Sequence, residues 1–324
     1  MKYDVSGIGS PLLDLSLEVD DHILNSLNLK KGSMKLLSLD EARQILSLIE
    51  SKGFDIRKSP GGQTANVLAG VSVLGGKSVF LGKIGDDEHG KIYYEASKRI
   101  GTHCRLSKHE ELDTGYAITF ITPDGERTFA TYLGASPHFG INDLDEKAIK
   151  LSKILHIEGF SLEDERFRKT IIHAVELAHH NNVKISLDLS DGELIKRNFN
   201  YFHYFVEKYV DVIFANENEA EAFTGERGLK ALEKMYKKSA LAIVKLGERG
   251  SLIRDAQNIY EILAHETDFL NSNGAGDIYA AGILYGLSKD IPLEKAGNLA
   301  SYIASLVVAK NEARIEEDLS HLIK

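Results

Sequence analysis

From residue 154 onwards, short apolar runs alternate with stretches of helical spacing, and this pattern constrains the fold more than any other feature. The apolar runs cover residues 154–157, 183–189, 210–215 and 241–246, and helical spacing appears at residues 168–178 and 229–236. Strands that are separated by helices pair in parallel, because the chain crosses back along the sheet after each strand. The sequence therefore predicts an α/β fold with a mostly parallel central sheet and helices on both faces.

Two segments of the first half have a different pattern. Residues 13–19 alternate apolar and polar side chains, which is typical of a half-exposed strand. Residues 115–122 and 126–133 are two strand-like runs joined by a Pro-Asp-Gly turn, which predicts a hairpin. We expect these segments to form a small β-sheet lid over the edge where parallel sheets bind ligands.

Nothing in the composition indicates a linker or a second domain. We expect one domain over residues 1–324, with the lid inserted from approximately residues 11–37 and 112–134. The formal net charge is −9 and basic residues are scattered, which argues against nucleic acid as a partner. Cys104 is the only cysteine, so an internal disulfide is excluded. Apolar runs fall short of the roughly 18 residues of a membrane span, and we expect a cytoplasmic protein without a membrane partner.

A glycine-rich turn opens a helix near residue 277. Its sequence is Asn271-Ser272-Asn273-Gly274-Ala275-Gly276-Asp277, and apolar residues continue at helical spacing. The start of a helix presents unpaired N–H groups and the positive end of the helix dipole, both of which favour a bound phosphate. Asp277 beside such a site suits a carboxylate that removes a proton from an attacking hydroxyl. The alternative is an ordinary loop with Asp277 as a helix cap.

A second glycine-rich loop precedes a helix at residues 61–66. It reads Gly61-Gly62-Gln63-Thr64-Ala65-Asn66, and the Asn66 amide can both donate to and accept from a hydroxyl. Asp14 follows another turn and could bind two neighbouring hydroxyls of a sugar. The alternatives are a plain strand-to-helix turn and a solvated strand residue.

Polar residues also follow two of the expected parallel strands. Asn216 and Glu219 come after the strand at 210–215 and could hold the waters of a magnesium ion, although acids are also common at helix starts. Lys245 lies at the end of the strand at 241–246, Gly247 and Gly250 follow it, and the segment suits a backbone site for the phosphates or ribose of a nucleotide. A simple glycine hairpin would explain these glycines almost as well.

Two partial motifs exclude other nucleotide-binding classes. Residues 85–92 match a P-loop up to Lys91, but Ile92 replaces the hydroxyl residue and three acids would repel phosphate. Residues 7–9 lack the third glycine of a dinucleotide fingerprint, so a nicotinamide dehydrogenase is not indicated.

Taken in chain order, these motifs resemble the ribokinase-like (PfkB) carbohydrate kinase family, in particular its adenosine-kinase-like branch. The segments that carry the resemblance are residues 7–14, 61–66, 85–90, 122–128, 216–219 and 273–277. The resemblance implies a large α/β domain with a small β lid. It also implies an enzyme that uses ATP and Mg²⁺ to phosphorylate a primary hydroxyl of a nucleoside or sugar.

The resemblance also implies roles for individual residues. Asp277 corresponds to the general base, and the backbone N–H groups of Gly274, Ala275 and Gly276 correspond to the anion hole. The remaining implied sites are Asp14, Gly61, Gly62, Gln63 and Asn66 for the substrate, Arg127, Lys245, Gly247, Gly250 and Asn273 for ATP and its phosphates, and Asn216 and Glu219 for magnesium through water.

Two departures from the family pattern leave alternatives open. Asn271-Ser272 stands where the family usually has Asp-Thr, so dependence on a monovalent cation such as K⁺ is open. Met34 and Ser161 stand where adenosine kinases tend to have a glutamine and an aromatic residue, so the acceptor is open among nucleosides and free sugars. A catalytically weak member that binds a nucleoside or sugar as a sensor is the alternative function. The chain is expected to be a monomer or a homodimer.

Overall fold

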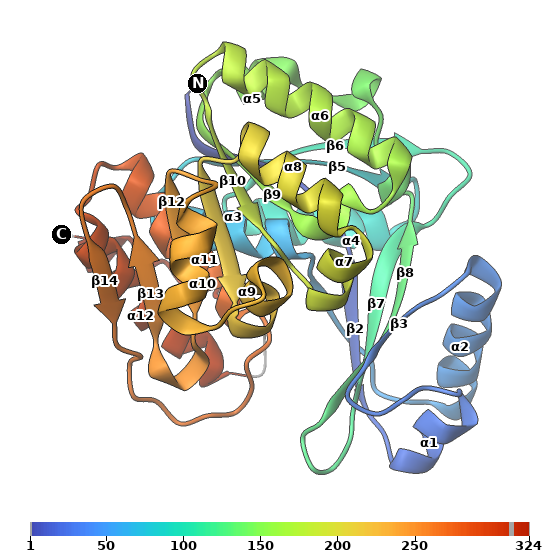
Figure 1. Cartoon of the computed structure of the whole chain (residues 1–324). Helices are drawn as coiled ribbons and strands as arrows, with labels where there is room; N and C mark the ends of the chain where they lie inside the picture. The colour runs from blue at the N-terminus through green and yellow to red at the C-terminus, as the bar shows by residue number, and fades with distance from the viewer. Residues whose placement is uncertain (1, 311–313, 324) are drawn as a thin grey trace.

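The computed structural model describes residues 2–310 and 314–323, and it contains two β-sheets of different size (Figure 1). Over the described residues, the larger sheet has nine strands in the order β14-β13-β12-β11-β10-β9-β1-β5-β6. From β12 to β6 the strands run parallel, whereas β13 and β14 pair antiparallel, so the predicted mostly parallel sheet is confirmed. Its strands are β1 Tyr3–Ile8, β5 Ser78–Gly85, β6 His103–His109, β9 Ser152–Glu158, β10 Lys184–Asp188, β11 Val212–Asn216, β12 Leu241–Lys245, β13 Ser251–Arg254 and β14 Ile259–Ile262.

Helices cover both faces of this sheet, as predicted (Figure 1). Each group of helices shares a buried apolar cluster with one face, and burial of apolar surface is the main force that holds these layers together. One face carries α5 Glu146–Lys150, α6 Glu165–His180, α7 Gly192–Arg197, α8 Phe199–Tyr209, α9 Glu217–Thr224 and α10 Gly228–Tyr236. The other face carries α3 Gln63–Val73, α4 Glu88–Arg99, α11 Ala275–Ser288 and α12 Leu293–Val308. Short 3₁₀ helices are η1 Ser136–His138, η2 Ile141–Asp143, η3 Gly159–Leu162, η4 Gly247–Arg249 and η5 Ser320–Ile323.

In the part of the chain that the structure describes, the smaller sheet has five strands in the order β3-β8-β7-β2-β4. These are β2 Leu13–Glu18, β3 Met34–Leu36, β4 Arg57–Pro60, β7 Thr114–Ile121 and β8 Arg127–Gly134, and α1 Asp21–Ser26 and α2 Leu39–Lys52 pack on one face. The antiparallel pairing of β7 with β8 confirms the predicted hairpin. The sheet also takes in β4, which lies beyond the two segments expected for the lid. Its sequence, Arg-Lys-Ser-Pro, has no apolar alternation that would indicate a strand.

Both sheets meet at the carboxyl edge of the larger one. The order of its strands reverses at β1, because β5 and β6 lie on one side of β1 and β9 to β14 lie on the other. Open parallel sheets bind ligands outside the strand ends at such a point. The first strand of the smaller sheet, β2, follows the carboxyl end of β1 after a short turn, so the smaller sheet is attached beside this point.

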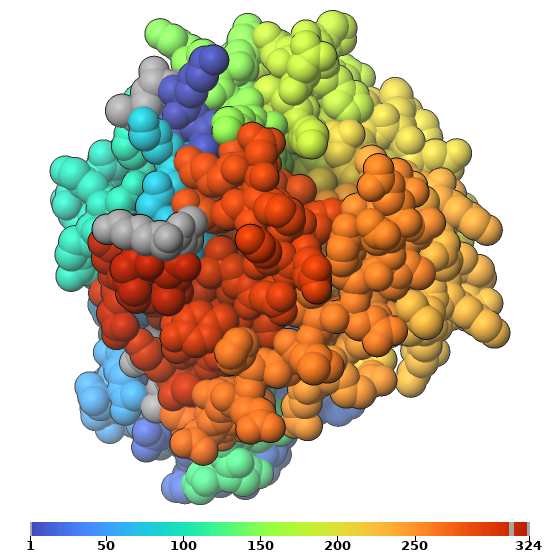
Figure 2. Space-filling view, turned by 90° about the vertical axis from the view of Figure 1, so that its left-hand side faces the viewer, coloured from blue at the N-terminus to red at the C-terminus, as the bar shows by residue number. Residues whose placement is uncertain are grey.

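The C-terminal third of the chain covers the middle of one side of the molecule, with the smaller sheet at its lower end (Figure 2). The helix α3 packs closely on α11. A Cβ at Gly70 would lie only 2.5 Å from the Cβ of Ala281, so this approach requires glycine at position 70. The contact matters for the site, since both helices begin at the carboxyl edge. Among the described residues, no helix combines the length and apolar character needed to cross a membrane.

Candidate active site

Asp277 lies in the first turn of α11, directly after the glycine-rich turn. Gly274 is the residue before the helix and has φ +77°, a conformation that residues with a Cβ rarely adopt. The turn is closed by the Ala275 N–H, which donates to the Ser272 carbonyl at 3.2 Å. The helix therefore begins at the carboxyl edge of the sheet with its positive dipole end and its first N–H groups beside Asp277.

The surroundings of Asp277 make its carboxyl group unusually basic. Burial raises its pKa to about 7, and this outweighs the hydrogen bond from Asn66 Nδ2 to Asp277 Oδ2 at 2.8 Å, which favours the charged form. The nearby acids Asp188 and Glu158 also raise the pKa, while Lys245 lowers it. A carboxylate with a pKa near neutrality is well matched to accepting a proton at physiological pH.

The partner of Asp277, Asn66, is itself held by a buried arginine. Arg314 Nε donates to Asn66 Oδ1 at 2.6 Å, and Arg314 Nη2 donates to the Gly61 carbonyl at 2.8 Å. Arg314 was not predicted from the sequence, because it follows α12 in a segment without any motif. Its contact with the loop at 61–66 arises only from tertiary packing.

Asp14 and Gly61 lie against each other at the junction of the two sheets. A Cβ at Gly61 would lie 2.4 Å from the Asp14 carboxylate oxygens, and the Gly61 N–H donates to the Leu12 carbonyl at 2.7 Å. Burial raises the pKa of Asp14 to about 6, whereas the charges of Arg314 and Arg127 lower it. The fold thus brings Asp14, Gly61, Asn66 and Asp277 into one connected group, and Arg127, at the start of β8, acts on it electrostatically.

Gly62 and Gln63 are fixed by contacts at the ends of β1 and β10. Gly62 has φ +92°, and a Cβ there would lie 2.3 Å from the Ser10 carbonyl oxygen. The Gln63 side chain accepts a hydrogen bond from Ser190 Oγ at 2.5 Å.

A buried carboxylate connects the first strand to this loop. Glu158, at the end of β9, accepts from the Ser10 N–H at 3.0 Å and from the Thr64 N–H at 2.9 Å. Burial raises the pKa of Glu158, and the two backbone N–H groups oppose this. Glu158 was not predicted, although an acid at the end of a parallel strand was a usable signal.

Lys245 lies beside the glycine-rich turn of α11. A Cβ at Gly276 would lie 3.2 Å from Lys245 Nζ, which also forms an ion pair of 2.7 Å with Asp188 at the end of β10. Burial disfavours the charged form of Lys245, but the carboxylates of Asp188 and Glu219 outweigh it, so the pKa of Lys245 is raised. Its position fits an ammonium group that faces a phosphate. Asp188 was also not predicted.

Asn216 and Glu219 form the cap of α9. The Asn216 N–H and Nδ2 donate to Glu219 Oε2 and Oε1 at 2.7 and 2.6 Å, and the Glu219 N–H donates to Asn216 Oδ1 at 2.9 Å. Burial, followed by the charge of Asp188, raises the pKa of Glu219 to about 7. Within residues 2–310 and 314–323, no three His, Cys, Asp or Glu side chains are grouped as metal ligands. A magnesium role for this pair remains a prediction.

Gly247 and Gly250 form the turn between β12 and β13. Both have positive φ, and the Gly250 N–H donates to the Gly247 carbonyl at 2.9 Å. A Cβ at Gly250 would lie 1.9 Å from the Ile262 carbonyl oxygen, so glycine is needed there for chain packing. Backbone conformation and chain packing therefore explain these two glycines without a bound nucleotide.

The departures at Asn271, Met34 and Ser161 have distinct surroundings. Asn271 is buried, its Oδ1 accepts from the Asn273 N–H at 2.8 Å, and its Nδ2 donates to the Lys310 carbonyl. Met34 is exposed on the edge strand β3, whereas Ser161 is buried and donates to the Glu158 carbonyl at 2.6 Å. Asn271 thus ties the glycine-rich turn to the segment that follows α12.

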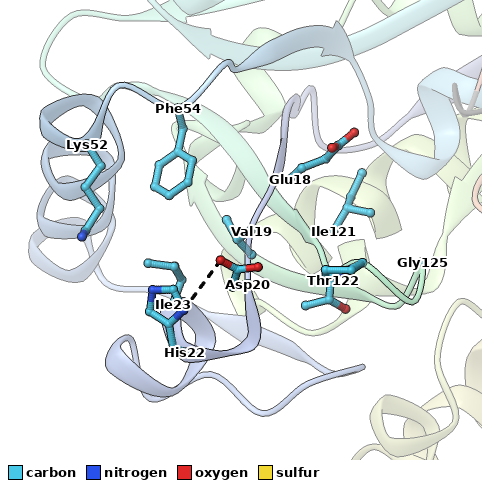
Figure 3. A pocket seen from close by; sticks show the side chains of 11 residues that line it. Glu18, Val19, Asp20, His22, Ile23, Lys52, Phe54, Ile121, Thr122 and Gly125 are labelled. Atoms are coloured by element: carbon cyan, nitrogen blue, oxygen red, sulfur yellow. Dashed lines mark ion pairs between the residues drawn. The ribbon is translucent and has the colours of Figure 1, made fainter.

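A cavity of about 700 Å³ lies in the smaller sheet but contains none of the predicted site residues (Figure 3). Its wall is formed by the end of β2, by α1, by the end of α2 and by the β7–β8 turn, and it includes Asp20, His22, Lys52 and Phe54. The only ion pair drawn there, His22 with Asp20 at 3.9 Å, is exposed and weak. The chemical groups described above therefore lie elsewhere, along the carboxyl edge of the larger sheet and at its junction with the smaller one.

Comparison with known proteins decides the family. The model of the family described as pfkB family carbohydrate kinase matches residues 33–318. The chain belongs to the PfkB carbohydrate kinase family. As a PfkB kinase it is an enzyme that phosphorylates a small sugar or nucleoside, which confirms the resemblance and the enzyme class expected from the sequence.

Curated relatives match most of the chain. A 5-dehydro-2-deoxygluconokinase of Listeria monocytogenes is 29% identical over 307 residues, which cover 89% of this chain and 94% of the relative. One of the same name from Halalkalibacterium halodurans is 30% identical over 270 residues, with coverage of 79% and 81%.

Solved structures of PfkB-type kinases share the fold. The adenosine kinase of Sinorhizobium meliloti has a TM-score of 0.91 at 30% identity, with coverage of 100% of this chain and 99% of that one. A probable sugar kinase of Rhizobium etli also gives a TM-score of 0.91, at 28% identity and with coverage of 99% and 98%. The ribokinase-like fold, with its large sheet and additional small sheet, is thus confirmed.

Proposed function

We propose that this PfkB kinase transfers the γ-phosphoryl group of ATP to a primary hydroxyl of a nucleoside or sugar, with Asp277 as general base. The observation that carries the proposal is the position of Asp277 at the start of α11, with a pKa of about 7 and a hydrogen bond from Asn66. Asp277 accepts the proton of the acceptor hydroxyl as its oxygen attacks the phosphorus. Asp14, with Gly61, Gly62, Gln63 and Asn66, binds the remaining hydroxyls.

Charge that develops on the phosphate is stabilised by groups already in place. The N–H groups of Gly274, Ala275 and Gly276 lie at the positive end of α11, where that of Ala275 also donates to the Ser272 carbonyl, and the Lys245 ammonium lies beside Gly276. Arg127, Asn273 and the turn with Gly247 and Gly250 complete the proposed ATP site. Groups fixed before the reaction do not need to reorganise during it, which lowers the barrier.

Asn216 and Glu219 fit magnesium only through water. Both Glu219 oxygens already accept hydrogen bonds from Asn216, which leaves the pair suited to binding the waters that magnesium usually keeps. When bound, the ion neutralises charge on the ATP phosphates. The roles of the protein residues above do not depend on a particular position of the ion.

The acceptor is proposed as a class rather than as one compound. The relatives of similar identity carry the names adenosine kinase and 5-dehydro-2-deoxygluconokinase, so both nucleosides and sugar acids belong in the test. Specificity within such a family depends on contacts in the pocket, not on the shared motifs.

A coupled ADP-release assay with nucleosides, ribose, fructose and sugar acids, with and without K⁺, tests the proposal. We expect one acceptor class to give turnover, and Asp277→Asn to lower kcat by about 10³-fold with the acceptor still bound. Asp145→Asn, which replaces the cap of α5 by another good cap, is the matched control and should retain activity. Near-normal turnover of Asp277→Asn would refute the role of Asp277. Acceptor binding without ADP release by the unaltered protein would favour the sensor function instead.

A further inference from the structure

A buried guanidinium connects three segments that lie far apart in the sequence. Arg314 comes after α12, Gly61 and Asn66 belong to the loop and first turn of α3, and Asp277 belongs to α11. Arg314 is only 7% exposed, and it contacts the loop through two different nitrogens. Burial of a charge is costly unless the group is hydrogen-bonded, so the Arg314 guanidinium must keep these hydrogen bonds to the loop.

The position of Arg314 is fixed by more than one contact. Its Nη2 donates to the Gly61 carbonyl at 2.8 Å, and the same carbonyl accepts from the Tyr93 hydroxyl at 3.0 Å. Its Cζ lies 6.0 Å from the centre of the Tyr93 ring. These contacts fix the orientation of the guanidinium plane, and Nε donates to Asn66 Oδ1 at 2.6 Å.

The guanidinium determines which end of the Asn66 amide faces Asp277. A guanidinium can only donate hydrogen bonds, so it requires the amide oxygen on its side. The amide nitrogen must then face Asp277, where it donates to Oδ2 at 2.8 Å. A flipped amide would place its N–H groups against the guanidinium and its oxygen against a carboxylate, which loses both bonds.

We propose that Arg314 is a positioning residue for phosphoryl transfer: it fixes the Asn66 amide so that this amide holds the Asp277 carboxylate in place. The inference rests on the proposed function of Asp277 as general base. It also gives Asn66 a second role, because both ends of its amide are already engaged by the protein before any acceptor binds.

The charged groups around Asp277 determine how loss of Arg314 changes its affinity for a proton. Asp277 faces Asp188, Glu158 and Lys245 as well as Asn66, and the Asn66 hydrogen bond is the largest influence that favours its charged form. Loss of Arg314 frees the amide to rotate, while burial and the two acids remain. Asp277 then binds its proton more tightly. Asp14 loses the charge of Arg314 but keeps that of Arg127.

Arg314→Met tests the proposal through kcat, KM and the pH profile. We expect kcat to fall about tenfold or more, the acidic limb of kcat to move to higher pH, and KM for the acceptor to change less than kcat. Arg314→Lys keeps the charge but has a single nitrogen, which cannot bind Asn66 and Gly61 in the same fork. It should therefore give little rescue.

A double-mutant cycle with Asn66→Ala separates positioning from a general structural effect. If Arg314 acts through Asn66, Arg314→Met should produce no further fall in kcat and no further shift of the acidic limb in the Asn66→Ala background. An equal effect of Arg314→Met in both backgrounds would overturn the proposal.

The chain offers a matched control arginine. Arg168, on α6, also donates through Nε and Nη2, to the carbonyls of Leu162 and Glu163 at 2.7 and 3.1 Å, and lies over the Tyr201 ring. Arg168→Met should lower the melting temperature while leaving the acidic limb unchanged. A shift of that limb in Arg168→Met as large as in Arg314→Met would also count against the proposal.

Asn66→Asp keeps the inference testable if Arg314→Met does not fold. The new carboxylate still accepts from Arg314 but offers Asp277 an acceptor and a like charge, so kcat should fall and its acidic limb should move to higher pH. An unchanged limb in a folded Asn66→Asp variant would refute the positioning role. Failure of the underlying function is distinguishable, since Asp277→Asn would then retain turnover or the unaltered protein would release no ADP.

Discussion

Asp277, the proposed general base, carries a cost for the folded state. Its pKa is raised from the ordinary 3.8 to about 7, chiefly by burial. The folded protein therefore binds this proton more tightly than the unfolded chain. The contribution of Asp277 to the free energy of unfolding is largest below about pH 4 and declines as the pH rises to about 7. Above that pH, the native state keeps a charge that its surroundings disfavour.

Asp277→Asn should consequently be more stable than the unaltered protein at pH 8. The amide is uncharged, and its oxygen can still accept from Asn66, so a gain on the order of 1 kcal/mol is expected. Melting temperatures by calorimetry at pH 8, 6 and 4 would show the difference shrink as the pH falls. A stability gain of Asp277→Asn that is smaller at pH 8 than at pH 4 would contradict this account.

The residues predicted from the sequence and those missed differ in their local surroundings. Asp277 and Asn66 each follow glycines at the start of a helix, which made them candidates, and the family resemblance of the motifs in chain order selected them over a plain cap or turn. Arg314 has no such pattern, and its role depends on contacts that form only when α12 packs against the large sheet. Asp188 and Glu158 are single acids at strand ends, where the sequence alone does not show which strands will be neighbours.

At the scale of elements, the loop between β4 and α3 is shaped by the close approach of Gly61 to Asp14. Gly61→Ala would place a Cβ 2.4 Å from the carboxylate oxygens of Asp14, so the carboxylate or the loop must move. We expect KM for the acceptor to rise about tenfold with a smaller change in kcat, because a hydroxyl contact is displaced.

A second alanine variant controls for the loss of a glycine. Gly140 has a negative φ, and a Cβ there would meet only Asp143 Oδ2, at an ordinary 3.6 Å. Gly140→Ala should leave both kinetic constants unchanged. Steady-state kinetics of the two variants side by side give the comparison, and equal KM values for both would argue against the Asp14 contact.

The junction between the two sheets is held by a hydroxyl. Thr114, at the start of β7, donates its Oγ1–H to Asp87 Oδ1 at 2.6 Å and accepts from the Gly85 N–H at 2.9 Å. Asp87 is also the cap of α4 and accepts from the Gly90 N–H. The start of the hairpin is therefore tied to the large sheet and to one of its helices.

Thr114→Val should destabilise the protein by about 1–3 kcal/mol, because it keeps the shape but leaves the buried Gly85 N–H without an acceptor. Urea denaturation measures this loss. Thr170→Val, in α6, removes one hydrogen bond to the Phe139 carbonyl and serves as the control away from the junction. Only Thr114→Val is expected to raise KM for the acceptor as well. A loss below about 0.5 kcal/mol would contradict the role of this hydroxyl.

Elements with a regular pattern were predictable, and the others were not. The alternating strands and helices after residue 154 were recovered because their apolar spacing is regular over many residues. The strand β4 has mostly exposed polar side chains and, within the described part of the chain, pairs only with β2, so tertiary pairing makes it a strand.

For the whole molecule, the decisive feature is that the smaller sheet meets the larger one at its carboxyl edge. The smaller sheet is connected to the larger one at the carboxyl end of β1, where Asp14 and Gly61 lie against each other. A sheet attached in this way can move over bound substrates and exclude water from the phosphoryl group.

We therefore expect the radius of gyration to decrease when an acceptor and a non-hydrolysable ATP analogue are both present. Small-angle X-ray scattering of the unaltered protein, alone, with each ligand and with both, measures this. The contraction should be largest with both ligands, because each binds at the same edge. An unchanged scattering profile in the ternary mixture would show that the smaller sheet is already closed.

The network around Arg314 also bears on how the protein becomes active during synthesis. Because synthesis proceeds from the N-terminus, Asp14 and Asn66 emerge from the ribosome long before residues 277 and 314. A nascent chain that lacks residue 314 has the proposed hydroxyl-binding loop but not Arg314, the residue that we propose to orient the general base. Ribosome-bound chains that end before residue 314 should thus consume ATP more slowly than the released protein, and full activity is expected only after the first and last segments of the chain have packed together.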